Sequence, residues 1–596
     1  MKKIKQTLRS HIDVMRRVNF FVLDAKVKKI LLVWLPCSIA ITQFPLISAY
    51  FFGQVVNKLS SQKSIFGEMS LFITTGVLIF WYLLARLIRF VNTRKESIFR
   101  REVSNKTEHQ YWKASARLDL QDRENTEVQD AISDAQRNYS AVLDIFFTQW
   151  GISGSIIALA TSATVLGLVE WWYVVLVIAI LLPGIYLNRS RKSKTFKQQK
   201  RLNELKRYRT ELSSNIGTKE TIINGATHYF LSRYDSLRQK LLMMQTKLDF
   251  KFQNIAVTGD IWYWLLMGFL YYHLFNKVID GVMPIGNLFL AFTAVNQLHE
   301  NLSAILTKIV DIEDQSRRAK DFFLIVDMSP AIIDRPDAQD VAQNVAPIIE
   351  FSNVWFKYPN TEMYILKGVT FTIQSGERIG LVGENGEGKT TLAYLMLRFY
   401  EPTEGSIRIN GIDLRLIKRD SLFAIAGIVF QDFNLFQARV SETIRSSSFE
   451  KTSTMNEIIQ SAMMAGIHTD IDTFEQKYDQ KIGRMYKGGI KLSGGQRQKI
   501  SIASLLYRNP KLMILDELTS ALSPTAEYNV IKEYAEVSKG KTCLFICQRY
   551  KSLEVVDRII VLKDGVVAEN GTQSELIAQK GIFNSMFEHA QLRVVS

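Results

Sequence analysis

The sequence predicts two folds in one chain, an all-α membrane domain of six helices followed by a soluble α/β domain. Six long apolar segments occur before residue 311. After about residue 349 there are short apolar runs, such as the one in 377–382, which Gly383 follows, and the one in 512–517, which ends in two acidic residues. For a chain of 596 residues the expected parts are an N-terminal segment 1–29, a membrane domain 30–311, a linker 312–348 and an α/β domain 349–596.

A helix needs about 20 apolar residues to cross a bilayer, and the predicted membrane helices follow this rule. They cover residues 30–52, 71–91, 141–167, 171–187, 255–275 and 285–309. Six crossings return the chain to its starting side. The connections after the second and fourth segments are long, so we expect helices that extend into the cytosol. Contacts with the α/β domain are expected near 122–126 and 218–221, with plain solvated loops as the alternative.

Polar residues inside membrane segments are costly and often functional. The segments contain Gln43, Asp260, His273, Asn296, Gln297 and Glu300. If they faced one cavity, they would suit a polar or cationic substrate. The alternative for Asp260 and Glu300 is a position near the cytosolic ends, where water reaches them, and for each of the six residues alone a role outside function is slightly favoured.

The net charge of +16 is concentrated beside the membrane segments. Lys and Arg dominate residues 1–29 and 189–201, and an excess of these residues marks the cytoplasmic side of a membrane. The charge therefore indicates a lipid bilayer as partner and a cytoplasmic N-terminus, with no nucleic-acid partner. The first apolar segment follows a long basic lead without a cleavage site, so we expect a retained helix. Cys37, Cys543 and Cys547 are expected to be packing residues.

A phosphate-binding loop follows the apolar strand predicted at 377–382 and leads into a helix predicted at 392–398. Its residues are Gly383, Glu384, Asn385, Gly386, Glu387, Gly388, Lys389, Thr390 and the adjoining Thr391. Backbone amides and the helix N-terminus of such a loop hold phosphates. Lys389 would neutralise the β- and γ-phosphates, and the Thr390 hydroxyl would bind Mg²⁺. The predicted cofactors are therefore ATP and Mg²⁺.

Further residues complete a hydrolytic site. Asp516 and Glu517 end an apolar strand, where Asp516 would hold Mg²⁺ through water and Glu517 would act as general base. Gln431 follows another apolar strand and would touch Mg²⁺ or the attacking water. Tyr358 precedes the phosphate loop and would stack on adenine. These types and spacings predict an ATPase.

A second glycine motif precedes a helix predicted to begin at Arg497. It consists of Leu492, Ser493, Gly494, Gly495 and Gln496, and we call it the signature. Its hydroxyl, amides and helix N-terminus would form a second cradle for a γ-phosphate. The signature is not expected to reach the phosphate loop of its own chain, which implies a head-to-tail dimer of two such domains.

On these motifs the chain resembles a half-transporter of the ATP-binding cassette (ABC) exporters of type IV, with one membrane domain fused to one nucleotide-binding domain. The resemblance covers nearly the whole chain. It implies that two ATP molecules bind between two nucleotide-binding domains, that closure turns the membrane domains from inward- to outward-facing, and that hydrolysis resets them. It also implies a bacterial plasma membrane, a cytoplasmic ATPase domain and a second half-transporter.

A finer resemblance concerns the substrate. Residues 483–490 carry an aromatic residue and glycines, and with 118–137 and 219–234 they resemble lantibiotic and related peptide exporters. The expected substrate is therefore a peptide, and multidrug or lipid export is the alternative. The chain has no room before the first membrane segment for a cysteine protease domain, so we expect export without cleavage of a leader.

Three positions depart from the family pattern. Leu518 replaces the usual Pro, Ser523 replaces an Asp that communicates between the two ATP sites, and Gln548 replaces a His that bonds the γ-phosphate. Gln548 can donate a hydrogen bond but carries no positive charge. Either the chain is the catalytically slow half of a heterodimer, or it forms a homodimer with two slow sites. A half that binds ATP without useful hydrolysis is a further possibility, which the retained Glu517 opposes.

Overall fold

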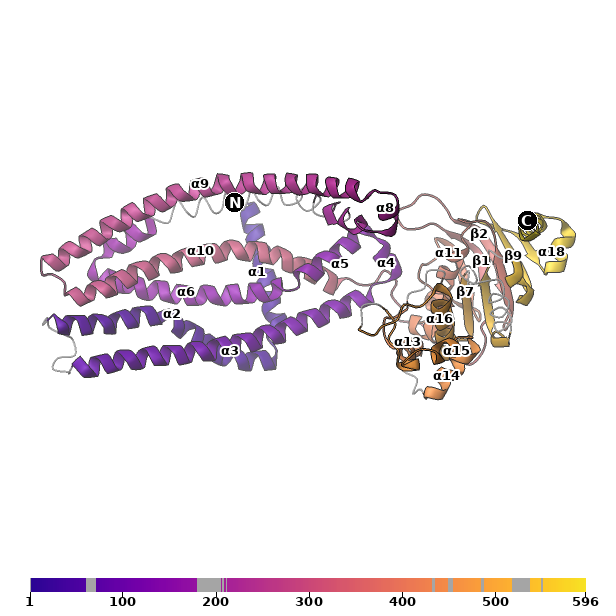
Figure 1. Cartoon of the computed structure of the whole chain (residues 1–596), viewed down its shortest axis with the longest axis horizontal. Helices are drawn as coiled ribbons and strands as arrows, with labels where there is room; N and C mark the ends of the chain where they lie inside the picture. Colours follow the sequence, from indigo (N-terminus) through magenta and orange to yellow (C-terminus); the bar gives the residue numbers. More distant parts are fainter. Residues whose placement is uncertain are drawn as a thin grey trace. The chain divides into compact units, whose positions relative to one another are not determined.

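The computed structural model describes residues 2–60, 71–179, 205, 208–210, 212–430, 435–448, 454–483, 487–516, 536–547 and 550–595. The chain forms two compact units (Figure 1). The first unit contains residues 1–117 and 127–328, and the second contains residues 118–126 and 329–596. We call residues 118–126 the inserted loop, because in sequence they connect two helices of the first unit although their contacts place them in the second.

The first unit is built from helices, the longest of which lie side by side (Figure 1). They are α1 Lys2–Val22, α2 Ala25–Leu59, α3 Leu71–Arg117, α5 Thr126–Asn138, α6 Ala141–Val169, α8 Lys219–Ile223, α9 Thr227–Ile279 and α10 Ile285–Asp327, with further helical residues at 171–179. Phe99, Phe146 and Phe322 are fully buried where α3, α6 and α10 meet α1. Aromatic packing of this kind buries a large apolar area for each residue ordered.

By length and composition, three of the described helices can cross a membrane: α2, the Phe72–Arg117 part of α3, and α6. They contain the first three predicted segments. The predicted segment 171–187 extends beyond the described residues, and segments 255–275 and 285–309 lie within α9 and α10. The prediction that the connections after the second and fourth apolar segments contain helical extensions is confirmed by α3 and α9. α10 also continues past its apolar segment, into residues predicted as a linker. Pro36 and Pro45 lie inside α2, which continues through both.

The second unit contains two sheets. The antiparallel sheet has the order β2-β1-β4-β5, and the larger sheet has the order β10-β9-β3-β8-β7-β6 with only β10 antiparallel to its neighbour. The strands are β1 Ile349–Phe356, β2 Leu366–Ile373, β3 Arg378–Val382, β4 Glu404–Ile409, β5 Ile412–Asp413, β6 Ala426–Val429, β7 Leu512–Asp516, β8 Thr542–Ile546, β9 Arg558–Lys563 and β10 Val566–Gly571. Because β3, β8, β7 and β6 are parallel, their carboxyl ends lie at one edge.

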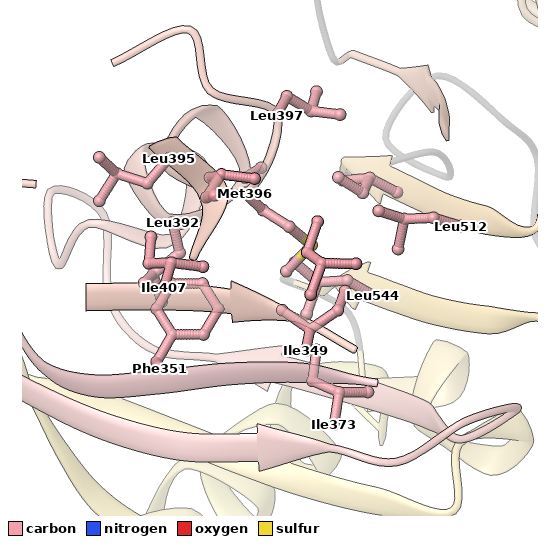
Figure 2. Packing of buried hydrophobic residues seen from close by; sticks show 14 of the residues in the cluster. Ile349, Phe351, Ile373, Leu392, Leu395, Met396, Leu397, Ile407, Leu512 and Leu544 are labelled. Atoms are coloured by element: carbon pink, nitrogen blue, oxygen red, sulfur yellow. The ribbon is translucent and has the colours of Figure 1, made fainter. Parts of the chain in front are cut away.

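Helix α11 (Lys389–Met396) packs in the core between the sheets (Figure 2). Figure 2 shows side chains from this helix, from β1, β2 and β4, and from β7 and β8 gathered together. They include Leu392, Leu395, Met396, Ile349, Phe351, Ile373, Ile407, Leu512 and Leu544, all nearly or fully buried. This packing fixes the start of α11 against the strand that precedes it.

The remaining elements of the second unit are mainly short helices. They are α4 Leu120–Glu124, η1 Leu414–Leu416, α12 Arg419–Ile425, α13 Val440–Arg445, η2 Ser446–Ser448, α14 Met455–Met464, α15 His468–Asp472, η3 Lys477–Asp479, α16 Gly494–Arg508, η4 Tyr550–Val555, α18 Gln573–Gln579 and α19 Ile582–Val595. Two predicted helix starts are wrong by about three residues. α11 begins at Lys389 instead of Leu392, and α16 begins at Gly494 instead of Arg497, because the glycine motifs themselves supply the first turns.

Candidate nucleotide site

The phosphate loop begins where β3 ends, at the carboxyl edge of the large sheet. A Cβ atom on Gly383 would lie 2.5 Å from the carbonyl oxygen of Leu562, so only glycine fits there. Gly388 has φ +95°, a conformation that L side chains rarely adopt, and α11 begins directly after it. The loop amides and the N-terminus of α11 therefore share one end of the sheet, which favours an anion. Glu384, Asn385 and Gly386 are exposed at the tip of the loop, and Glu387 is partly buried.

Lys389 is the buried cation of this loop. Its side chain is 6% exposed, and its Nζ atom donates hydrogen bonds to the carbonyl oxygens of Gly383 at 2.7 Å and Glu384 at 2.8 Å. A buried ammonium group needs such acceptors, and a phosphate oxygen is a stronger one. The predicted contact between Lys389 and a nucleotide phosphate fits this position.

Two oxygen donors meet beside the loop. The Thr390 hydroxyl lies 3.1 Å from Oδ2 of Asp516, whose side chain is buried at the end of β7. A hydroxyl and a carboxylate are ligands that Mg²⁺ prefers. These two oxygen ligands therefore fit Mg²⁺. Two residues alone do not complete its coordination, and the remaining ligands would come from water and nucleotide phosphate.

Three predicted site residues, Gln431, Glu517 and Gln548, lie outside the described residues. The strands that precede them in sequence do lie together. Leu515 of β7 pairs with Val429 of β6, and Asp516 pairs with Ile546 of β8. The chain therefore reaches the same edge of the sheet just before each of the three positions.

Tyr358 lies between the end of β1 and the phosphate loop. Its hydroxyl is 2.9 Å from the Thr391 hydroxyl, and its half-buried ring stands edge-on to Phe356 and Tyr400 at centroid distances of 5.1 and 5.3 Å. Burial raises the pKa of Tyr358, so the hydroxyl stays protonated at neutral pH. The ring is thus fixed next to the first turn of α11.

The signature forms the N-terminal turn of α16. Ser493 is the N-cap: its side chain accepts a hydrogen bond from the Gln496 amide at 3.2 Å, and its own amide donates to Oε1 of Gln496 at 3.1 Å. Leu492 is buried and anchors the turn, whereas Ser493 and Gly494 are exposed and Gly495 is partly buried. The polar groups of the signature can therefore meet another molecule.

The inserted loop is bound to the second unit by a buried carboxylate. Asp119 accepts hydrogen bonds from the backbone amide of Ile332 at 2.9 Å and from the guanidinium group of Arg419. Asp122 accepts from the amide of Ala331 at 3.1 Å. The predicted contact near 122–126 is confirmed. The other predicted contact, near 218–221, lies at α8 in the first unit.

A second contact links the inserted loop to Tyr400, one of the rings that pack against Tyr358. The Tyr400 hydroxyl donates to the carboxylate of Glu124, and burial together with this carboxylate raises the pKa of Tyr400. Sequence reasoning missed Asp119, Arg419 and Tyr400, since residues about 280–300 positions apart form these contacts and no local pattern marks them.

Among the polar residues of the membrane segments, the structure brings two together. Oε1 of Gln43 accepts a hydrogen bond from Thr161 at 2.8 Å, and the Gln297 amide donates to the backbone carbonyl of the adjacent Thr42. His273 instead pairs with Tyr173, and Asn296 pairs with Tyr271. The side chain of Asp260 lies outside the described part, and Glu300 is exposed. Among the five whose side chains are described, these bonds do not join all of them into one cluster.

The chain is similar to one protein-family model and to several known transport proteins. The family model described as ABC transporter matches residues 366–520. The subtilin transport ATP-binding protein of Bacillus subtilis is 26% identical over 91% of this chain and 89% of that protein. The ATP-dependent lipid A-core flippase of Salmonella paratyphi A is 30% identical over 69% of this chain and 70% of that protein.

A solved structure shares the fold. The structure of a bacterial Atm1-family ABC exporter with ATP bound superposes with a TM-score of 0.79 at 23% identity, covering 95% of this chain and 99% of that one. The helical unit and the α/β unit therefore have the fold of an ABC exporter. With a phosphate loop, an ATP-binding domain match and a relative that aligns over two thirds of both chains, the protein belongs to the ABC transporter family and is an ATPase coupled to membrane transport.

Proposed function

We propose that this protein exports a peptide across the bacterial plasma membrane, driven by ATP bound between its own ATPase domain and that of a second half-transporter. The similarity to the subtilin transport protein carries this proposal, because it spans 91% of this chain. It therefore includes the membrane half, where a substrate would bind. Together with the resemblance of residues 483–490 to peptide exporters, this similarity leads us to propose a peptide as the substrate class.

Each residue of the site has its own role in the binding and hydrolysis of ATP. Tyr358 stacks on the adenine, Lys389 and the loop amides neutralise the phosphates, and Thr390 and Asp516 would hold Mg²⁺, which supplies further positive charge when bound. Glu517 accepts the proton of the attacking water, and Gln431 contacts Mg²⁺ or that water and senses the γ-phosphate. Catalysis then rests on positioning and on charge stabilisation around the transferred phosphoryl group.

The second ATP-binding surface comes from the partner's signature. Exporters with one membrane and one ATPase domain typically act as dimers, and the exposed Ser493 and Gly494 are available for such a contact. We propose that the hydroxyl of Ser493 and the amides of the glycines contact the γ-phosphate held by the other chain. The partner is a second copy or a related half.

Gln548 and Ser523 are relevant to whether the partner is a second copy of this chain or a related half. A neutral Gln548 leaves the γ-phosphate without a cation that the family usually provides. A heterodimer would place a faster site on the partner, completed by the intact signature of this chain. A homodimer would instead work through two slow sites that substrate stimulates.

A lipid exporter is a second candidate, favoured by the 30% identity to the lipid A-core flippase. The test compares stimulation of ATP hydrolysis by the full chain in lipid nanodiscs. A subtilin precursor peptide should raise turnover, whereas lipid A and a cationic dye should not, and Glu517→Gln should abolish every response. Stimulation by lipid A alone would favour the second candidate.

A further inference from the structure

An aspartate outside all the motifs is bonded to the signature. Asp470 lies on α15, and its Oδ1 atom accepts a hydrogen bond from the side-chain amide of Gln496 at 3.2 Å. We propose that Asp470 is a positioning residue that holds the signature in the geometry needed to meet the γ-phosphate on the partner. The inference rests on the proposed function, because only an ATP sandwich gives the signature this role.

The Gln496 side chain is held at both ends. Its Oε1 atom accepts from the Ser493 amide at 3.1 Å, while its Nε2 atom donates to Asp470. The Asp470 contact therefore fixes which end of the carboxamide faces Ser493, since a flipped amide would bring two donors together. A long side chain at the start of a helix otherwise samples several rotamers. Through the side chain of Gln496, the contact with α15 therefore restricts the conformation of the exposed Ser493.

Lys499, one turn further along α16, compensates the charge of Asp470. Its Nζ atom lies 3.4 Å from Oδ2 of Asp470 and donates to the carbonyl oxygen of Gly466 at 2.9 Å. An uncompensated carboxylate close to a helix N-terminus would oppose an incoming phosphate. The pair keeps the hydrogen bond to Gln496 while it removes most of this repulsion.

The helix that carries Asp470 is itself held in place. His468 at its start bonds the Tyr478 hydroxyl through Nδ1 at 2.9 Å, and Ile471 is fully buried in the core below. Asp472 on the same helix points elsewhere, with an ion pair to Lys477 at 3.2 Å, and its side chain is exposed. Asp472 therefore offers a matched control on the same short helix.

The test uses the full chain in lipid nanodiscs with Asp470→Ala, Asp470→Asn and the control Asp472→Ala. Hydrogen exchange of residues 493–499 should quicken about fivefold to tenfold in Asp470→Ala, the effect of losing one hydrogen bond. Exchange in the phosphate loop should not change. Asp470→Asn keeps an oxygen acceptor for Gln496 and should stay within about twofold of the parent, as should Asp472→Ala.

Turnover gives the second readout. Asp470→Ala should lower the kcat for ATP by about fivefold while the binding of a fluorescent ATP analogue to the phosphate loop is unchanged. Unchanged exchange in 493–499, or an equal loss of analogue binding and melting temperature, would overturn the inference. If the parent chain turns over no ATP but the exchange pattern holds, the positioning role stands and the proposed ATPase dimer of this chain alone fails.

Discussion

At the scale of single residues, we expect Mg²⁺ binding to depend on the hydroxyl group of Thr390. It lies 3.1 Å from the buried carboxylate of Asp516, and both oxygens would hold Mg²⁺. Thr390→Val keeps the shape of the side chain but removes this ligand. We expect ATP hydrolysis to fall about 100-fold and to need a higher Mg²⁺ concentration. A titration of activity against Mg²⁺ measures both, and Thr390→Ser is the control that keeps the hydroxyl. Full activity in the Val variant would contradict the assignment.

The neutral side chain of Gln548 is expected to limit the rate of ATP hydrolysis. If the missing cation limits turnover, Gln548→His should raise the basal kcat about tenfold by adding charge beside the transferred phosphoryl group. The assay is ATP hydrolysis by the full chain in nanodiscs, with Gln548→Ala as the control that removes the hydrogen bond as well. Equal rates for all three proteins would show that this position does not limit turnover.

At the scale of elements, the inserted loop is bound to the ATPase fold by Asp119. Removing a buried carboxylate leaves the Arg419 guanidinium without its ion pair and Ile332 without an acceptor. We expect Asp119→Ala to lower the stability of the second unit by about 3 kcal/mol. Thermal unfolding of the full chain measures this, with the exposed Asp337→Ala as the control. A melting temperature like that of the control would show that the buried pair does not hold the loop.

The contact between Glu124 and Tyr400 connects the same loop to the rings around Tyr358, the residue proposed to stack on adenine. Tyr400→Phe and Glu124→Gln each remove the charge-assisted bond but keep the ring and the chain volume. If the bond positions Tyr358, each change should raise the KM for ATP about threefold, and the double variant should be no worse than either single. Additive effects in this double-mutant cycle would mean that the two residues act separately.

Local elements could be predicted from the sequence, because their signals are contiguous. The phosphate loop, the strand ending at Asp516 and the signature each contain the residues that define them within about eight positions. Asp470 and Asp119 could not be found in this way. Their partners, Gln496 and Arg419, lie 26 and 300 positions away, and a lone Asp on a short polar segment has the same pattern whether it is solvated or buried.

At the scale of the whole molecule, the two-part organisation follows from hydropathy and is matched by the exporter fold. The sidedness is a proposal, drawn from the Lys and Arg excess in 1–29 and 189–201. Asp280→Cys, between α9 and α10, and Lys219→Cys, in α8, can test it in a Cys37→Ala background. A membrane-impermeant maleimide should label only the first in intact cells and both in broken cells. Labelling of the α8 cysteine in intact cells would reverse the proposed topology.

The central claim is that this chain hydrolyses ATP within a dimer of ATPase domains. The most direct test is the ATPase rate of the full chain purified alone in lipid nanodiscs, with the oligomeric mass recorded on the same sample. If the partner is a second copy, we expect a dimer whose turnover is removed by Glu517→Gln while ATP binding is kept. If the partner is a related half, we expect a sample without turnover that gains it only when that half is added. A rate that persists in the Glu517→Gln variant, or turnover by a sample that is monomeric throughout, would contradict it.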